Sequence, residues 1–128
     1  MSRLIKGVSV AALLTTLAFS SSCGGGDDLT PVESCNQVWS ILCDKFFNCL
    51  TPEQKEANKS VIGLNAADCK VKFQGTECNA DKAACNAGET FRPANAQMCL
   101  SGLMTLSCTD VKADPIVTPA ICDQVCTK

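Results

Sequence analysis

The cysteines constrain the fold of this chain more than any other feature. The sequence of 128 residues has 11 cysteines, a density that indicates a disulfide scaffold in an exported protein. A domain of about a hundred residues buries only about 60–70% of its unfolded surface, so each bridge, worth about 2–4 kcal/mol, matters for stability. We therefore expect all cysteines after residue 30 to be disulfide-bonded: Cys35, Cys43, Cys49, Cys69, Cys78, Cys85, Cys99, Cys108, Cys122 and Cys126.

The pairing of these ten cysteines is left open by the sequence, because ten cysteines allow about 945 connectivities. Geometry narrows the choice slightly. Cys122 and Cys126 are four residues apart in an expected helix, so their parallel side chains should reach different partners. If one helix holds both Cys99 and Cys108, they lie roughly 13 Å apart along its axis and cannot bond.

The first 22 residues have the pattern of a secretory signal peptide. Arg3 and Lys6 form a basic start, an apolar run follows from 7 to 19, and three serines precede Cys23. The run is shorter than the roughly 20 apolar residues that a spanning helix needs. The alternative, an amphipathic helix of the folded domain, would require a polar face, which this segment lacks. We predict that residues 1–22 are a signal peptide.

Cys23 is the expected site of lipid attachment. The segment Ser-Ser-Ser-Cys23-Gly-Gly-Gly-Asp-Asp resembles the junction of bacterial lipoproteins, although Ser20 stands where those proteins usually have an aliphatic residue. Cleavage after Ser20, with Ala18 as the second small residue, is the competing interpretation. A flexible Gly-rich tether and the even number of cysteines left without Cys23 favour lipidation. The prediction is an envelope lipoprotein of the outer membrane, exposed to the periplasm or cell surface, with a tether over 23–30 and one domain over 31–128.

The domain is expected to be all-α. Thr30-Pro31-Val32-Glu33 combines an N-cap, a first-turn proline and a capping box. An apolar stripe at spacings of three and four residues then predicts a helix over 31–49. The later expected elements are an exposed helical turn or two over 51–60, a helix from Asn65 that stops at Gly75, a loop with one turn over 76–92, a helix from Pro93 to near Cys108, and a last helix after Pro119.

No segment alternates with the period of two that marks strands. The predicted fold is therefore a small disulfide-stapled bundle of about four helices with long loops. Trp39 lies on the stripe of the first helix, which predicts a core position, with a binding platform as the alternative.

The C-terminal third resembles a known group of proteins. Its segments Phe91-Arg92-Pro93, Ala96 to Leu100, Leu106-Ser107-Cys108 and Pro119 to Cys126 are similar to the uncharacterised cysteine-rich lipoproteins of the myxobacterial type. That group shares the Cys-Gly-Gly mature start and a first helix with spaced cysteines. The resemblance implies an envelope location and adds no mechanism.

The absence of certain residue types excludes several kinds of catalytic and metal site. The chain has no histidine, which excludes Ser-His-Asp catalysis, His-containing zinc sites and C-x-x-C-H haem attachment. It also has no C-x-x-C pair for thiol redox chemistry. Cys122 and Cys126 alone have zinc-knuckle spacing, and disulfide bonding is the favoured interpretation for them. We expect no enzymatic activity, no catalytic residue, no metal and no cofactor.

The net charge of the mature chain narrows the classes of partner that it can bind. Once Arg3 and Lys6 leave with the signal peptide, 9 basic residues face 13 acidic ones, a net charge of −4. An acidic domain without a basic stripe predicts no nucleic-acid partner, and lipid on Cys23 must supply the membrane attachment. We expect a non-enzymatic binding or structural module for a protein or envelope component of unknown identity, with contacts through 51–64 and 76–92. The alternatives are a saposin-like lipid-binding module, or an enzyme that uses carboxylates alone.

Overall fold

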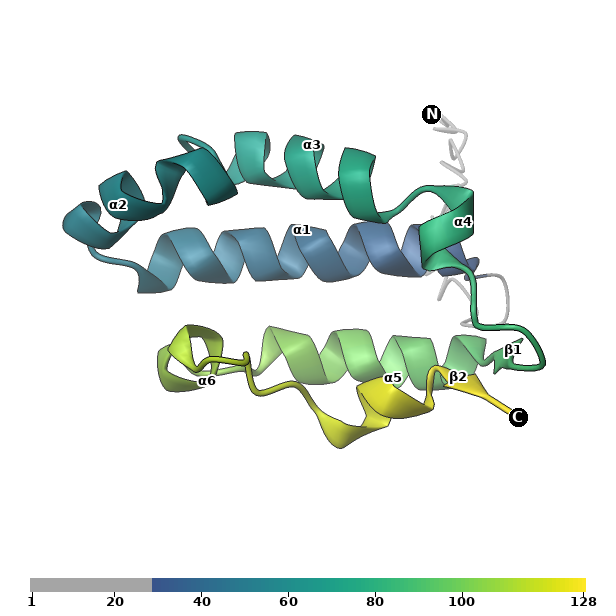
Figure 1. The fold of residues 1–128 in the computed structure, drawn as a ribbon. Coiled ribbons are helices and arrows are strands. Elements are labelled where there is room, and N and C mark those ends of the chain that lie inside the picture. Colours follow the sequence, from purple (N-terminus) through teal and green to yellow (C-terminus); the bar gives the residue numbers. More distant parts are fainter. Residues whose placement is uncertain (1–28) are drawn as a thin grey trace, which may run out of the picture.

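The computed structural model describes residues 29–128, so the predicted signal peptide and Cys23 lie outside the described residues. The described chain is mostly helical, with one pair of very short strands (Figure 1). In chain order the elements are α1 (Pro31–Cys49), α2 (Pro52–Ile62), α3 (Ala66–Glu77), α4 (Ala80–Ala83), β1 (Thr90–Phe91), α5 (Pro93–Met104), α6 (Cys108–Lys112), the 3-10 helix η2 (Ala120–Gln124) and β2 (Cys126–Thr127).

Helix α1 is the central element of the fold. It runs between α2 and α3 on one side and α5 and α6 on the other (Figure 1). Its start is fixed by a capping box, in which the Thr30 hydroxyl accepts from the Glu33 N–H and the Glu33 carboxylate accepts from the Thr30 N–H. The helix begins and ends where the capping signals and the apolar stripe predicted, at Pro31 and Cys49.

Two hydrophobic clusters flank α1. Leu42 packs with Cys99 and Leu103 of α5, whereas the next residue, Cys43, packs with Ile62 and Cys69 from α2 and α3. Successive residues of a helix point about 100° apart, so neighbours on α1 serve opposite layers. One long helix thereby organises both halves of the core.

Five disulfide bonds connect these layers. Three begin on α1: two of these reach α3 and the cysteine at its C-terminal end, and the third reaches the first residue of α6. The pairs are Cys35–Cys78, Cys43–Cys69, Cys49–Cys108, Cys85–Cys126 and Cys99–Cys122. The expected all-α, disulfide-stapled fold is confirmed.

Two predicted helix ends were wrong. Helix α3 continues through Gly75 to Glu77 and ends at Cys78, which is bonded to Cys35 of α1. Helix α5 stops at Met104 instead of continuing to Cys108. A second capping box, between Ser107 and Asp110, starts α6 there as a new helix.

The predicted C-terminal helix was also wrong. Only a 3-10 helix forms, and Cys126 lies in β2, which pairs antiparallel with β1 through the register Phe91 to Cys126. The two cysteines therefore do not share one helix face. They nevertheless reach different partners, as predicted, because Cys122 is bonded to Cys99 and Cys126 to Cys85.

Helix α2 is longer than the predicted exposed turn or two. It covers eleven residues and buries Ile62, its last residue, against Cys43 and Cys69. One buried side chain at its end is enough to fix a helix that is otherwise polar. None of the helices within residues 29–128 combines the length and the apolar character needed to cross a membrane.

Candidate functional site

A pocket of about 300 Å³ lies where α1, α4, α5 and the C-terminal segment meet. This volume is at the lower end of the range of roughly 300–1,000 Å³ for small-molecule sites. Its lining is mostly apolar and consists of Pro31, Ser34, Cys35, Val38, Leu42, Lys82, Ala83, Phe91, Cys99, Leu103, Thr118, Cys122, Val125 and Cys126.

One wall of the pocket is the first half of the α1 stripe. Pro31, Ser34, Val38 and Leu42 follow one another at spacings of three and four residues, so they share one helix face. Leu42 is buried against α5, whereas Val38 is only half-buried. The part of the stripe nearest the start of the helix thus remains open as a lining surface.

Three of the five disulfides border the pocket. Cys99 and Cys122 form one bridge within its lining, while Cys35 and Cys126 belong to bridges that reach Cys78 and Cys85. Covalent links therefore hold every wall to another part of the chain. A pocket with fixed walls loses little conformational entropy when a ligand binds.

Hydrogen bonds join the C-terminal wall to the start of α5. The Arg92 N–H donates to the Val125 carbonyl over 2.7 Å, and the Asn95 side-chain amide donates to the Gln124 carbonyl over 2.7 Å. These bonds and the β1–β2 pair keep Phe91 and Val125 in place at the pocket.

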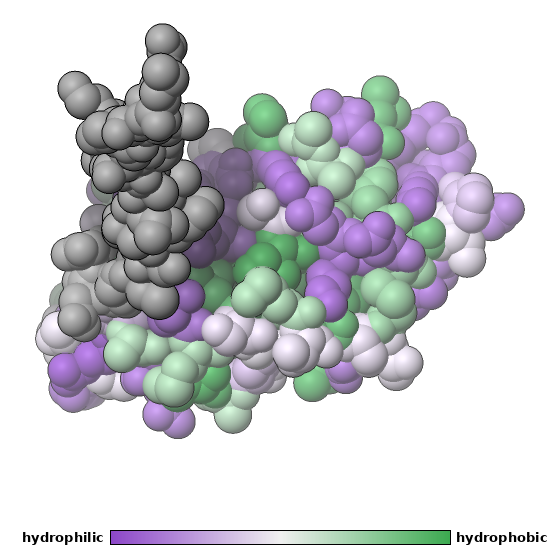
Figure 2. All heavy atoms as spheres, turned by 180° about the vertical axis from the view of Figure 1, so that it is seen from behind, coloured by the Kyte–Doolittle hydropathy of each residue, from purple (hydrophilic) through white to green (hydrophobic). Residues whose placement is uncertain are grey.

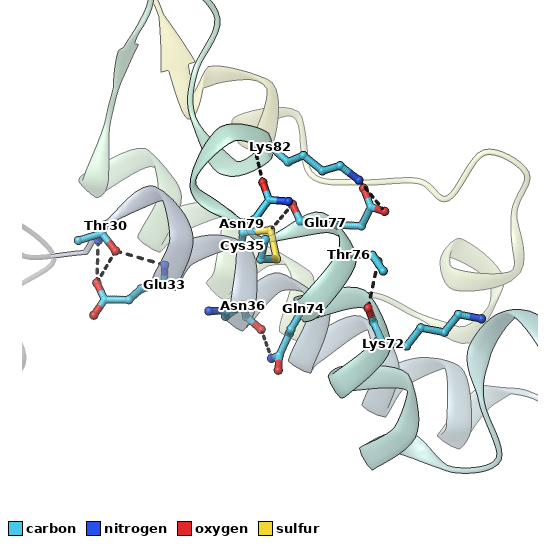
Figure 3. The surroundings of a disulfide bond; sticks show 11 residues. Thr30, Glu33, Cys35, Asn36, Lys72, Gln74, Thr76, Glu77, Asn79 and Lys82 are labelled. Carbon is cyan, nitrogen blue, oxygen red and sulfur yellow. Dashed lines mark hydrogen bonds and ion pairs between the residues drawn. A yellow bond between two sulfur atoms is a disulfide. The ribbon is translucent and has the colours of Figure 1, made fainter.

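Lys82 is the charged residue of the lining within the described residues, and Ser34 is the buried polar one. Figure 3 shows the Lys82 side chain extending from α4 toward Glu77 at the end of α3. The Lys82 Nζ to Glu77 Oε1 distance is 3.5 Å, and the two side chains are 52% and 44% exposed. So long and exposed an ion pair contributes little free energy, which leaves the ammonium available to another anion.

The carboxylates with displaced pKa values lie in the first turns of helices and are not part of the pocket lining. The Thr30 backbone N–H, followed by its hydroxyl, lowers the pKa of Glu33. A hydrogen bond from its own backbone N–H lowers the pKa of Glu53, and the Ser107 hydroxyl lowers that of Asp110. A general acid needs the opposite shift. Glu33 and Asp110 instead complete capping boxes, and Glu53 lies in the first turn of α2, where a negative charge is favourable.

The other residues singled out from the sequence have structural roles in the fold. Trp39 is half-buried: its ring stacks on Phe73 and packs against the cluster around Leu42, so it lies at the edge of the predicted core. Cys122 and Cys126 belong to separate bridges, and no group of three or more Cys, Asp or Glu within residues 29–128 is arranged to hold a metal ion. Lipidation of Cys23 concerns a residue outside the described part.

Of the two segments predicted to make contacts, only one reaches the pocket. Residues 76–92 supply Lys82, Ala83 and Phe91 to its lining, whereas 51–64 is mostly helix α2 on the other side of α1. Sequence reasoning missed the pocket itself. Its apolar residues have the same spacing as core residues, and the pairing of Cys99 with Cys122 that forms one wall is not encoded in any local pattern.

Large exposed hydrophobic side chains are an alternative binding surface. The most exposed, Leu64 at 77% and Val71 at 75%, belong to different segments, and Met98 lies on α5. On the face drawn in Figure 2, hydrophobic and hydrophilic side chains are interspersed, with hydrophobic ones gathered in a hollow near the middle. Single exposed apolar residues are normal on protein surfaces, so the pocket is the better candidate.

Comparisons with protein-family models, with curated proteins and with solved structures find no match for this chain.

Proposed function

We propose that this protein is an envelope lipoprotein, anchored through lipid on Cys23, whose disulfide-bonded domain is a non-enzymatic binding module. The pocket between α1 and α5 is its binding site, and a small, mostly apolar component of the envelope is its ligand. The observation on which the proposal depends is the composition of the lining, which is apolar, bordered by three disulfides and free of carboxylates within the described residues.

The position of the pocket supports a role close to a membrane. Pro31 lines the pocket and is eight residues after Cys23 in the sequence. Eight extended residues span at most about 28 Å, so a lipid-anchored Cys23 would keep the pocket near the bilayer surface. A ligand that partitions into or leaves that bilayer would meet the pocket at high local concentration.

The carboxylate-based enzyme is the weaker alternative. Asp68 accepts hydrogen bonds from the Leu64 N–H at 3.3 Å and from the Asn65 amide at 3.0 Å, so it holds the start of α3. Glu77 lies beside Lys82 and is not part of the pocket lining. Acid–base catalysis would need such a group within hydrogen-bonding reach of a bound substrate.

A saposin-like lipid module is the second alternative, and the apolar lining favours lipid binding. Saposin-type domains, however, have six cysteines in a different spacing, whereas five bridges are formed here. The likeness is therefore one of ligand chemistry only.

A thermal-shift experiment tests the proposal. The full chain, recovered from the envelope of an expressing host, is heated with and without a low-molecular-weight extract of the same envelope. A ligand that binds only the folded state raises its melting temperature, and we expect Ala83→Trp, which fills the pocket, to abolish that rise. Ala57→Trp, at an exposed position of α2, is the matched control and should keep it.

Two results would overturn the proposal. The first is an extract that leaves the melting temperature of the wild-type protein unchanged. The second is turnover of an extract component that is lost in Asp68→Ala or Glu77→Ala while the fold is retained, because that result indicates an enzyme.

A further inference from the structure

We infer that the pocket binds a single-chain fatty acid, with the hydrocarbon chain in the pocket and the carboxylate at Lys82. This inference rests on the proposed binding function and specifies its ligand. It follows from the size of the pocket, the chemistry of its lining and the charge at its edge.

The size of the pocket fits one chain. A methylene group is about as large as a water molecule, whose share of liquid volume is about 30 Å³, so a pocket of about 300 Å³ holds roughly ten such groups. A medium-length chain fills this space, whereas the two chains of a diacyl lipid do not fit.

The lining suits a hydrocarbon chain. Aliphatic and aromatic side chains from separate elements, including Val38, Leu103, Phe91 and Val125, surround the space, and the Cys99–Cys122 bridge adds apolar sulfur. Each methylene that moves from water into such surroundings gains free energy without requiring a directed partner. A ligand with several polar groups along its length would find, besides Lys82, the side-chain hydroxyls of Ser34 and Thr118 in this lining.

The charge at the pocket selects the head group. Lys82 supplies a positive charge, and no carboxylate within the described residues lines the pocket to attract a cation. The present partner of Lys82 is Glu77, at 3.5 Å, and both side chains are about half exposed. A fatty-acid carboxylate at the pocket mouth can replace that weak partner, because exposed ion pairs of this kind are worth little.

A photo-crosslinking experiment tests this assignment. Membranes that contain the full chain are isolated and mixed with a photoreactive, alkyne-tagged fatty acid of about ten carbons. Adding the probe after synthesis prevents its metabolic incorporation at Cys23. After irradiation, digestion and mass spectrometry should place the label on peptides that line the pocket.

Variants separate the chain from the head group. Ala83→Trp fills the pocket with an indole ring and should lower pocket labelling by at least tenfold, because losing the burial of only two methylene groups already corresponds to about tenfold. Lys82→Glu should lower labelling by the acid about fivefold, the size expected for a lost exposed ion pair. The alcohol analogue of the probe should be unaffected by Lys82→Glu. Glu77→Gln should increase labelling by the acid because it frees Lys82, and Lys112→Glu on α6 is the charge control that should change nothing.

Each contrary outcome has a defined meaning. The inference is overturned if Ala83→Trp leaves labelling by the acid unchanged, or if the label maps outside the pocket. Equal labelling by acid and alcohol in wild type and in Lys82→Glu overturns the head-group assignment. If the fatty acid fails but the envelope extract still gives a pocket-dependent thermal shift, the proposed function stands and only the ligand is wrong. Loss of both results overturns the proposed function together with this inference.

Discussion

The indole of Trp39 and the ring of Phe73 stack face to face, with centroids 4.1 Å apart and planes only 6° from parallel. Trp39 comes from α1 and Phe73 from α3, so the pair joins the central helix to the layer above it in Figure 1. Two disulfides, Cys35–Cys78 and Cys43–Cys69, connect the same two helices. Ring stacking thus adds a noncovalent contact to a covalently linked helix pair.

Removing the stacked ring should destabilise the fold measurably. We expect Phe73→Ala to lower the free energy of unfolding by about 2 kcal/mol, less than a fully buried ring would cost because Phe73 is only half-buried. Val71→Ala, at an exposed position of the same helix, should change it by less than about 0.5 kcal/mol. The measurement is urea denaturation followed by the fluorescence of Trp39, which is the single tryptophan of the chain. Equal effects of the two substitutions would contradict the stacking assignment.

The contact between α1 and α5 should not tolerate a charge. Leu42 is 7% exposed and packs against Cys99 and Leu103, so Leu42→Asp places an unpaired carboxylate in the core. We expect this variant to prevent accumulation of folded, disulfide-bonded protein, and Gln37→Asp, at an exposed position of α1, to leave the yield unchanged. Circular dichroism and the yield under non-reducing conditions are the readouts. Normal yield and helicity of Leu42→Asp would show that this face of α1 is not core.

Two glycines in helices should respond in opposite directions to alanine. A Cβ at Gly75 in α3 meets no atom within 4 Å, so Gly75→Ala should stabilise the protein by about 0.5–1 kcal/mol. A Cβ at Gly102 in α5 would lie 2.7 Å from Pro119 Cγ, in a segment held near α5 by the Cys99–Cys122 bridge. We expect Gly102→Ala to cost about 1–3 kcal/mol through overpacking. Melting temperatures that shift in the same direction would show that α5 and this segment are not in close contact.

Acid should weaken the helix N-termini. The pKa of Glu33 is held below its ordinary value of 4.5 by Thr30, and the pKa of Asp110 below 3.8 by Ser107. Lowered folded-state values mean that these carboxylates contribute stability above the unfolded pKa values, and that the contribution is lost as the pH falls through the lowered ones. The free energy of unfolding should therefore decrease between about pH 5 and pH 3.

Glu33→Gln tests the assignment of this pH dependence. Glutamine can still accept from the Thr30 N–H but does not titrate, so the variant should unfold with a smaller dependence on pH in the acid range. Thr30→Ala removes the hydroxyl and should cost about 1 kcal/mol at neutral pH. An acid dependence that is identical in wild type and Glu33→Gln would remove Glu33 from the explanation.

Local signals predicted the elements that local interactions determine. Thr30, Pro31 and Glu33 fixed the start of α1, and its apolar stripe fixed its extent, because capping and side-chain periodicity act within a few residues. The same reasoning placed Asn65 correctly as the cap of α3, where its side chain accepts from the Asp68 N–H.

Long-range interactions determined what the sequence did not predict. Gly75 remains helical because α3 is bonded to α1 on both sides of it, at Cys69 and Cys78. Cys126 leaves the helix because it pairs with Cys85 and with the backbone of Phe91. The pocket depends on such long-range bridges. It therefore forms with one disulfide connectivity among the many that ten cysteines allow, and no local motif predicts it.

Mass spectrometry of the full chain from host membranes, under non-reducing conditions, reports the lipid on Cys23 and the disulfide pairs in one experiment. We predict an N-terminal peptide that begins at lipid-modified Cys23. We also predict five crosslinked pairs: Cys35 with Cys78, Cys43 with Cys69, Cys49 with Cys108, Cys85 with Cys126 and Cys99 with Cys122. An unmodified N-terminus at Ser21, or free thiols in place of the three bridges that border the pocket, would contradict this prediction.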